Sequence, residues 1–205
     1  MGRVLDAIDQ QGLRDNTLVI FISDNGAALY THATSNAPLQ GGKFTFFEGG
    51  VRVPFAMRWP GQIPEGATFE APVSSVDIVK TIAEATGLPL PQDRVYDGVD
   101  LLPYVRGEKQ GEPHEALFWR AGYTRAVRSG SLKFLRDDLA KASALFDLAL
   151  DPGELHDLSA ERPDDVARLS AQLDAWDAQC VQPLWPAVMD YRFVANDGRA
   201  WWYPL

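Results

Sequence analysis

The sequence predicts an α/β fold, in which part of a mixed sheet with flanking helices is followed by a small α+β C-terminal subdomain. Three observations support this prediction. The apolar run Leu18–Ile22 lacks polar alternation, which is typical of a strand covered on both faces, as in parallel sheets. Helical patterns lie on either side of it, at residues 3–13 and 74–87. After residue 113, short strand-like segments alternate with tight turns, which indicates an antiparallel sheet.

Residues 1–110 are expected to form part of a larger α/β catalytic domain. The segment 3–13 is predicted to be an amphipathic helix with Val4, Leu5 and Ile8 on its apolar face. A short turn leads from this helix to the strand Leu18–Ile22. That strand has no earlier strand to pair with, so its edges would be bare, which folded proteins avoid. We therefore expect this chain to be the C-terminal part of a longer protein.

A long loop and a second helix complete this first domain. Residues 27–50 are polar and contain several glycines, and loops of this length inside a compact domain are usually functional. A second strand is predicted at residues 51–59. Ser74 followed by Asp77 matches the capping-box spacing, and Gly87 marks the end of the helix. The stripe expected to be buried comprises Val76, Val79, Ile82 and Ala83.

Residues 111–205 are expected to form the small α+β subdomain, beyond a polar hinge at residues 108–113. One amphipathic helix is predicted at residues 164–179. Four short strands are predicted, at residues 116–120, 123–128, 132–136 and 145–148. The aromatic residues of the tail are Trp185, Trp201, Trp202 and Tyr203. We expect this tail to dock on the body of the protein and fix the chain end, with a carbohydrate-binding platform as the alternative.

Charge and composition narrow the possible partners. The formal net charge is −9, which argues against nucleic acid or an anionic membrane surface as a partner, since both require a basic face. No apolar stretch is long enough to span a membrane, and no signal peptide is visible. The single Cys180 forms no intramolecular disulfide and no cysteine-rich zinc site. Compartment and oligomeric state stay open.

Asp24 and Asn25 directly follow the first predicted strand. In open α/β sheets, ligands bind just beyond the carboxyl ends of the strands. A carboxylate and an amide placed there supply hard oxygen ligands, which suit calcium or magnesium. The sequence Asp24-Asn25-Gly26 is also typical of a plain turn, because Asn and Gly tolerate positive φ angles. The downstream residues favour the functional interpretation.

Two glycine-containing segments follow. Gly41-Gly42-Lys43 places one cation on a flexible backbone that can approach other chain segments closely. Glu48-Gly49-Gly50-Val51-Arg52-Val53-Pro54 then leads into the second predicted strand. A local cation beside a metal can attract a small anion even when the net charge of the protein is negative.

In order, spacing and identity, these segments resemble the type I sulfatases, the formylglycine-dependent enzymes of the alkaline-phosphatase-like superfamily. The resemblance implies that Asp24 and Asn25 bind calcium, with magnesium less favoured, and that Lys43 contacts the sulfate of the substrate as a catalytic residue. The segment Leu145–Leu148 with the turn Asp151–Glu154 resembles the sulfatase C-terminal subdomain, so the resemblance covers nearly the whole chain. One departure is visible, because the family often has Gly-Thr-Thr after the lysine where this chain has Phe-Thr-Phe.

The nucleophile implied by the resemblance is absent from the sequence. In the family, formylglycine is made from Cys or Ser in a Cys-X-Pro-X-Arg context, whereas Cys180 has its proline one place late and no arginine. The remaining calcium carboxylates are missing as well. We expect the complete protein to hydrolyse a small-molecule or saccharide sulfate ester, and this chain alone to be inactive. The alternatives are a phosphate or phosphonate ester hydrolase and a non-catalytic truncated product.

The sequence gives little indication that any of the three histidines has a functional role. His32 lies in the long loop near the expected metal site, where a solvated residue is the default and a ligand is the alternative. His114 and His156 are flanked by turn residues and are predicted to lie on the surface.

Overall fold

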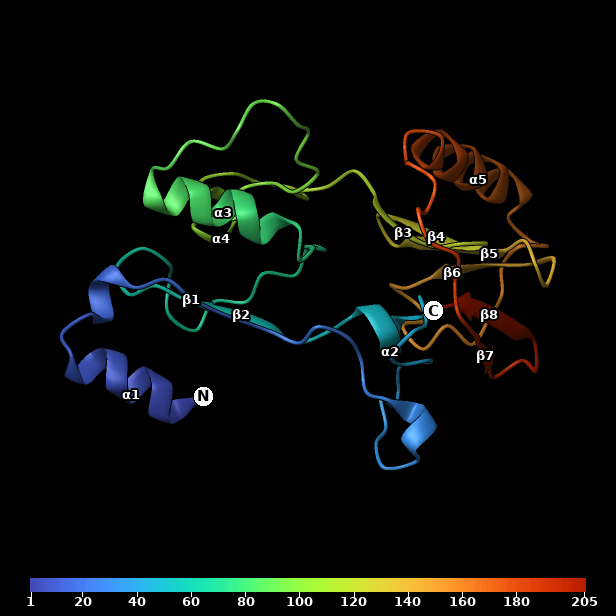
Figure 1. Cartoon of the computed structure of the whole chain (residues 1–205), viewed down its shortest axis with the longest axis horizontal. Coiled ribbons are helices and arrows are strands. Elements are labelled where there is room, and N and C mark those ends of the chain that lie inside the picture. Colours follow the sequence, from blue (N-terminus) through green and yellow to red (C-terminus); the bar gives the residue numbers. More distant parts are fainter. The chain divides into compact units, whose positions relative to one another are not determined.

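The computed structural model describes all 205 residues (Figure 1). Their contacts define two compact units, each built from two chain segments. Unit 1 comprises residues 1–22 and 54–115, and unit 2 comprises residues 23–53 and 116–205. The loop with Lys43 therefore packs in the same unit as the C-terminal sheet. The predicted domain division at residue 110 stays a prediction.

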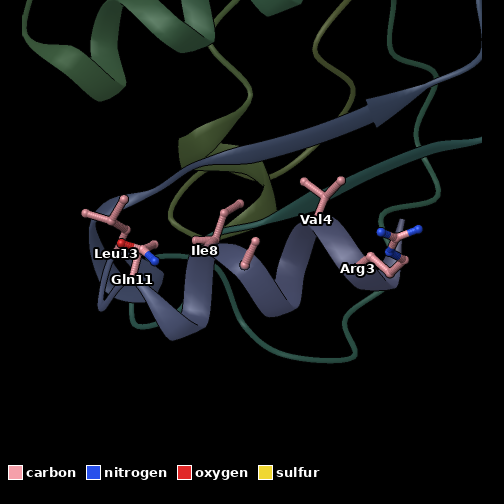
Figure 2. Close-up of a pocket in the computed structure, with 6 residues that line it drawn as sticks. Arg3, Val4, Ile8, Gln11 and Leu13 are labelled. Carbon is pink, nitrogen blue, oxygen red and sulfur yellow. The ribbon is translucent and has the colours of Figure 1, made fainter.

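Unit 1 contains helix α1 (Gly2–Gln10) and a two-stranded sheet. Strand β1 (Val19–Ile22) pairs antiparallel with β2 (Phe55–Arg58). The expectation that β1 is covered on both faces is wrong in this structure, because Phe21 is 46% exposed and β2 is the only strand paired with β1. The apolar side of α1 is likewise open, and Figure 2 shows Val4, Ile8 and Leu13 lining a pocket along it.

Helices α3 (Asp77–Thr86) and α4 (Leu102–Val105) complete unit 1. The predicted C-terminal end of α3 is confirmed, because Gly87 adopts a left-handed φ of 68°. The predicted cap at Ser74 is only half formed: the Asp77 carboxylate accepts the N–H of Ser74 at 2.7 Å, but no side chain caps the helix, which begins at Asp77. The prediction of a buried stripe is wrong. Val76, Val79 and Ile82 are 45–49% exposed, since no other part of the chain covers them. The periodicity of a helix identifies its apolar face but not whether a neighbour covers that face.

Unit 2 is built on a four-stranded antiparallel sheet, and the predicted arrangement of sheet plus helix is confirmed. The strands run in sequence order: β3 (Leu117–Ala121), β4 (Thr124–Ser129), β5 (Leu132–Asp137) and β6 (Ala142–Asp147). Helix α5 (Pro163–Asp177) covers one face, where Leu169 and Leu173 pack with Val127, Phe134 and Leu145. Neighbouring residues on a strand point to opposite faces, so Leu135 lies in a second core with Phe47 and Phe146.

The tail forms a hairpin that the sequence analysis did not identify. Strands β7 (Asp190–Val194) and β8 (Ala200–Pro204) pair antiparallel. The expected docking of the tail is confirmed, since Trp201 and Tyr203 are fully buried in the second core, although Trp185 is 79% exposed. Unit 2 also holds a short 3₁₀ turn η2 (Leu29–Thr31) and the single helical turn α2 (Glu48–Val51). None of the helices has the length and apolar character needed to cross a membrane.

Candidate functional site

The loop that carries Asp24 and Asn25 is held by its backbone. Ser23 donates its hydroxyl to the carbonyl of Asn25 at 2.9 Å, and the N–H of Gly26 donates to the carbonyl of Gly50 at 3.0 Å. A Cβ atom at Gly26 would lie 1.7 Å from the Gly49 oxygen, so no side chain fits there. Gly26 thus allows the Asp-Asn loop to contact the α2 turn directly.

The backbone of Lys43 is bonded to the same loop. Its N–H donates to the carbonyl of Ala27 at 3.0 Å, two residues beyond Asn25. Asn36 bridges the two segments, because its side chain accepts from the Ala27 N–H at 3.0 Å and donates to the Gly41 carbonyl at 2.9 Å. The position of the lysine backbone is therefore tied to that of the loop that carries Asp24 and Asn25.

The glycines of α2 explain why the spacing of the motif matters. Gly49 donates its N–H to the Gln40 carbonyl at 2.7 Å, and a Cβ on it would lie 2.3 Å from the Gly41 oxygen. A Cβ on Gly50 would lie 2.1 Å from the Thr45 oxygen. These close approaches require glycine, so the Gly-Gly-Lys and Glu-Gly-Gly segments pack against each other as bare backbone.

The side chains of the three predicted site residues form no internal hydrogen bond or ion pair. Asp24 is exposed and Asn25 is half-buried, and neither side chain forms a hydrogen bond or ion pair. Lys43 is half-buried and makes no ion pair, and its ammonium lies 5.3 Å from the centre of the Phe44 ring. A carboxylate, an amide and an ammonium of this kind can each engage a ligand without first losing an internal bond.

These residues fit part of a calcium site. Calcium prefers carboxylate and amide oxygens, which Asp24 and Asn25 offer, but it takes about six to eight ligands. The structure contains no group of three or more His, Cys, Asp or Glu residues arranged to hold a metal ion. Asp24 and Asn25 thus present two oxygen atoms of the kind that calcium prefers, and not a complete metal centre.

A buried ionic cluster lies behind the α2 turn, and the sequence analysis missed it. Lys133 of β5 is fully buried, and its ammonium lies 2.9 Å from a carboxylate oxygen of Glu48 and 2.9 Å from one of Glu154. Burial raises the pKa of Glu154 above its ordinary value, an effect that the Lys133 ammonium opposes. The available signal in the sequence was the position of Lys133 between the apolar residues Leu132 and Phe134. A lysine inside a buried strand needs an acidic partner in the core, because burying an unpaired charge is costly.

Glu154 also holds both ends of the loop that carries Lys43. Its side chain accepts the N–H of Glu48 at 2.6 Å, and its backbone carbonyl accepts the amide of Gln40 at 3.1 Å. The side-chain oxygen of Gln40 in turn accepts the N–H of Asn196 at 2.6 Å. The turn after β6 and the tail hairpin therefore clamp the loop at Gln40 and at Glu48.

The solvent exposure of the histidines agrees only in part with the prediction. His114 is not a surface group: its side chain is 10% exposed, and its Nε2 lies 2.9 and 3.0 Å from the two carboxylate oxygens of the fully buried Asp77. The Asp77 carboxylate at the start of α3 can accept the Nε2–H of the imidazole, which explains why the ring lies here. His156 is 81% exposed, as predicted. His32 is exposed, with a left-handed φ of 55°.

Comparison with known proteins identifies the relatives of this chain. The model of the sulfatase family matches residues 1–88. The steryl-sulfatase of Mus musculus is 37% identical over 87% of this chain and 34% of its own length, and that of Homo sapiens is 40% identical over 62% and 23%. An uncharacterised sulfatase of Escherichia coli, YdeN, is 35% identical over 64% and 23%. The chain spans between about a quarter and a third of these curated relatives.

Two crystal structures extend the likeness to the fold. Ps i-CgsB in complex with k-i-k-neocarrahexaose has a TM-score of 0.80 and 30% identity, over 90% of this chain and 41% of that one. The PsFucS1 sulfatase from Pseudoalteromonas sp. has a TM-score of 0.71 and 25% identity, over 86% and 40%. The predicted α/β fold of the alkaline-phosphatase-like type is confirmed by these similarities.

Proposed function

The chain belongs to the sulfatase family, and on that premise we propose that it forms part of the active site of a sulfuric ester hydrolase. One observation supports this most directly. The N–H of Lys43 is bonded to the carbonyl of Ala27, which ties a free cation to the loop that presents Asp24 and Asn25. An anion-binding group held beside two metal-binding oxygens suits the hydrolysis of a charged ester.

Lys43 is proposed to bind the sulfate group of the substrate. Its ammonium makes no ion pair within the protein, so an incoming anion meets no internal competitor. Charge on the sulfate oxygens must be neutralised as the ester bond breaks, and a fixed cation does this without reorganisation. The glycine contacts and the Asn36 bridge hold the lysine backbone in place.

Asp24 and Asn25 are proposed to hold calcium, together with ligands from outside these 205 residues. When bound, calcium supplies positive charge for the sulfate oxygens and for the nucleophile. The chain's own contribution is one carboxylate and one amide oxygen on a loop stabilised by Ser23 and Gly26. Magnesium is the less favoured ion, because it demands stricter octahedral geometry.

The nucleophile is proposed to be a formylglycine that lies outside this chain. The sequence has no Cys or Ser in a Cys-X-Pro-X-Arg context. Cys180, the only cysteine, is half-buried beyond the end of α5, and its sulfur lies 3.6 Å from the Trp176 carbonyl. Its local environment is that of a small packed residue.

The proposed substrate is an organic sulfate ester, on a small molecule or on a saccharide. Steryl-sulfatases and a structure that binds neocarrahexaose are both among the proteins similar to this chain. The shared requirement of such substrates is one sulfate group, which Lys43 would engage. The leaving group is determined by other residues.

The proposal can be tested with 4-nitrophenyl sulfate and 4-nitrophenyl phosphate as matched substrates. Both are offered to the 205-residue chain and to the complete reading frame that contains it. We expect no turnover by the chain alone and a preference for the sulfate ester by the complete product. A preference for phosphate would replace the proposal with a phosphate ester hydrolase. Rapid turnover by the chain alone would refute the external nucleophile, and inactivity of both would favour a non-catalytic protein.

A further inference from the structure

Three aromatic rings gather beside Lys43. Tyr30 stacks on Phe44 with ring centres 5.6 Å apart and an interplanar angle of 16°. Tyr191 of β7 completes the group, at 5.4 Å from Phe44 and 6.2 Å from Tyr30. These residues come from η2, from the Gly-Gly-Lys loop and from the tail hairpin. We define them as the aromatic patch.

The patch differs from the aromatic core of the same unit. Tyr30 is 47% exposed, and Phe44 and Tyr191 are half-buried, whereas Phe47 and Trp201 are fully buried. The core rings meet at angles of 51–89°, which is typical of packed interiors. The Tyr30–Phe44 pair is nearly parallel and leaves ring surface open to solvent.

Phe44 has an unusual backbone conformation. Its φ angle is +80°, in a region that bulky residues rarely adopt. The turn around it is fixed by neighbours, since Thr45 donates its N–H to the Gly42 carbonyl at 2.9 Å and accepts the Gly42 N–H on its hydroxyl at 3.1 Å. Strained residues of this kind concentrate at functional sites, and glycine would satisfy the backbone more easily.

We propose that the aromatic patch binds the leaving group of the sulfate ester, and that this group is a planar aromatic ring. The inference rests on the proposed function, because it places the sulfate at Lys43. That ammonium lies 5.3 Å from the centre of the Phe44 ring, so one ligand with an anionic group on a flat ring spans both. The patch offers ring faces and only two phenolic hydroxyl groups, whereas a pyranose ring carries several hydroxyl groups that need partners.

The test measures binding of four probes to the 205-residue chain by NMR titration. The probes are 4-methylumbelliferyl sulfate, 4-methylumbelliferone, glucose 6-sulfate and inorganic sulfate. The variants are Phe44→Gly, which suits the positive φ angle, and Tyr191→Ala, which removes a different ring of the patch. Trp185→Ala is the control, because it deletes an aromatic ring that is 79% exposed and outside the patch. Circular dichroism and thermal melting verify that each variant folds.

We expect both patch variants to weaken binding of 4-methylumbelliferyl sulfate by about three- to tenfold, the loss typical of one aromatic contact. Binding of inorganic sulfate stays unchanged in them, and Trp185→Ala changes neither. Unchanged affinity in both folded patch variants overturns the inference, as does failure of 4-methylumbelliferyl sulfate to bind. An equal loss for glucose 6-sulfate overturns the assignment to an aromatic group.

A fourth variant separates this inference from the proposed function. Lys43→Ala should abolish binding of inorganic sulfate and leave that of 4-methylumbelliferone unchanged. If sulfate binding survives the loss of Lys43, the proposed role of that lysine fails. The aromatic patch still stands in that case, provided that Phe44→Gly weakens binding of 4-methylumbelliferone.

Discussion

Lys43 and Lys133 lie in the same unit of the chain, yet their surroundings are opposite. Lys133 is fully buried between the carboxylates of Glu48 and Glu154, each 2.9 Å away. Lys43 is half-buried and has no ion-pair partner, and its ammonium lies 5.3 Å from the centre of the Phe44 ring. The two lysines therefore carry charge in different ways: the ammonium of Lys133 is compensated inside a buried cluster that holds the loop, and the ammonium of Lys43 is not compensated by any carboxylate.

The buried cluster around Lys133 is connected through hydrogen bonds and packing to the loop that carries Lys43. Glu48 begins the α2 turn, whose glycines pack on the backbone around Gly41 and Gly42. Glu154 holds the backbone of Glu48 and the side chain of Gln40. Lys133 thus supports the residues that position Lys43. Mutation of Lys133 should therefore lower stability, whereas mutation of Lys43 should lower activity.

The largest effect is expected from Lys133→Met. Removal of the ammonium leaves two buried carboxylates without their shared counter-ion, and breaking such a buried pair costs about 3–5 kcal/mol. Urea unfolding of the chain measures the change. Lys80→Met, at a lysine without an ion pair, is the control and should stay within about 0.5 kcal/mol. A loss below about 1 kcal/mol for Lys133→Met would contradict the structural role of the cluster.

Lys43→Ala should change stability little and activity strongly. Stability should change by no more than about 0.5 kcal/mol, because no internal ion pair is lost. In the complete reading frame, kcat/KM for 4-nitrophenyl sulfate should fall by about 10²- to 10³-fold, the typical effect of removing one preorganised group that stabilises charge. Equal activity of variant and parent protein would remove Lys43 from the proposed site.

Gly26→Ala tests whether close backbone contact holds the two loops together. The added Cβ would lie 1.7 Å from the Gly49 oxygen, so the Asp-Asn loop and the α2 turn must separate, at a cost of about 1–3 kcal/mol. Gly2→Ala is the matched control: nothing lies within 4 Å of its Cβ, and alanine is the better helix former. The free energy of unfolding should fall in the first variant and not in the second.

Local signals in the sequence predicted much of this architecture. Glycine at the end of α3 and the four strands of the C-terminal sheet each depend on residues that are close in sequence. The pair Gly41-Gly42 indicated a backbone that can approach other segments closely, and the glycine contacts in the structure have that form. The roles of Asp24, Asn25 and Lys43 toward metal and sulfate stay predictions.

Contacts between distant residues could not be predicted in the same way. Lys133 and Glu48 are 85 positions apart, and the sequence around either residue does not indicate which residue it pairs with. The hairpin β7–β8 was missed although Trp201 and Tyr203 alternate with Trp202, because aromatic residues near a chain end also suit an irregular tail. The exposure of Val79 and Ile82 depends on what packs over them, which periodicity does not encode.

The pH dependence of stability gives a subtler test of the buried cluster. Burial raises the pKa of Glu154, so the folded state binds its proton more tightly than the unfolded state does. This contribution to stability is fully present below the unfolded pKa of about 4.5 and is lost as the pH rises through the higher folded value. Glu154→Gln keeps an acceptor for the Glu48 N–H but cannot ionise. The difference in unfolding free energy between Glu154→Gln and the parent chain should therefore shift in favour of the variant between pH 4 and pH 7. A difference that stays constant over this range would show that Glu154 has the same proton affinity folded and unfolded, and that the Lys133 ammonium fully compensates its burial.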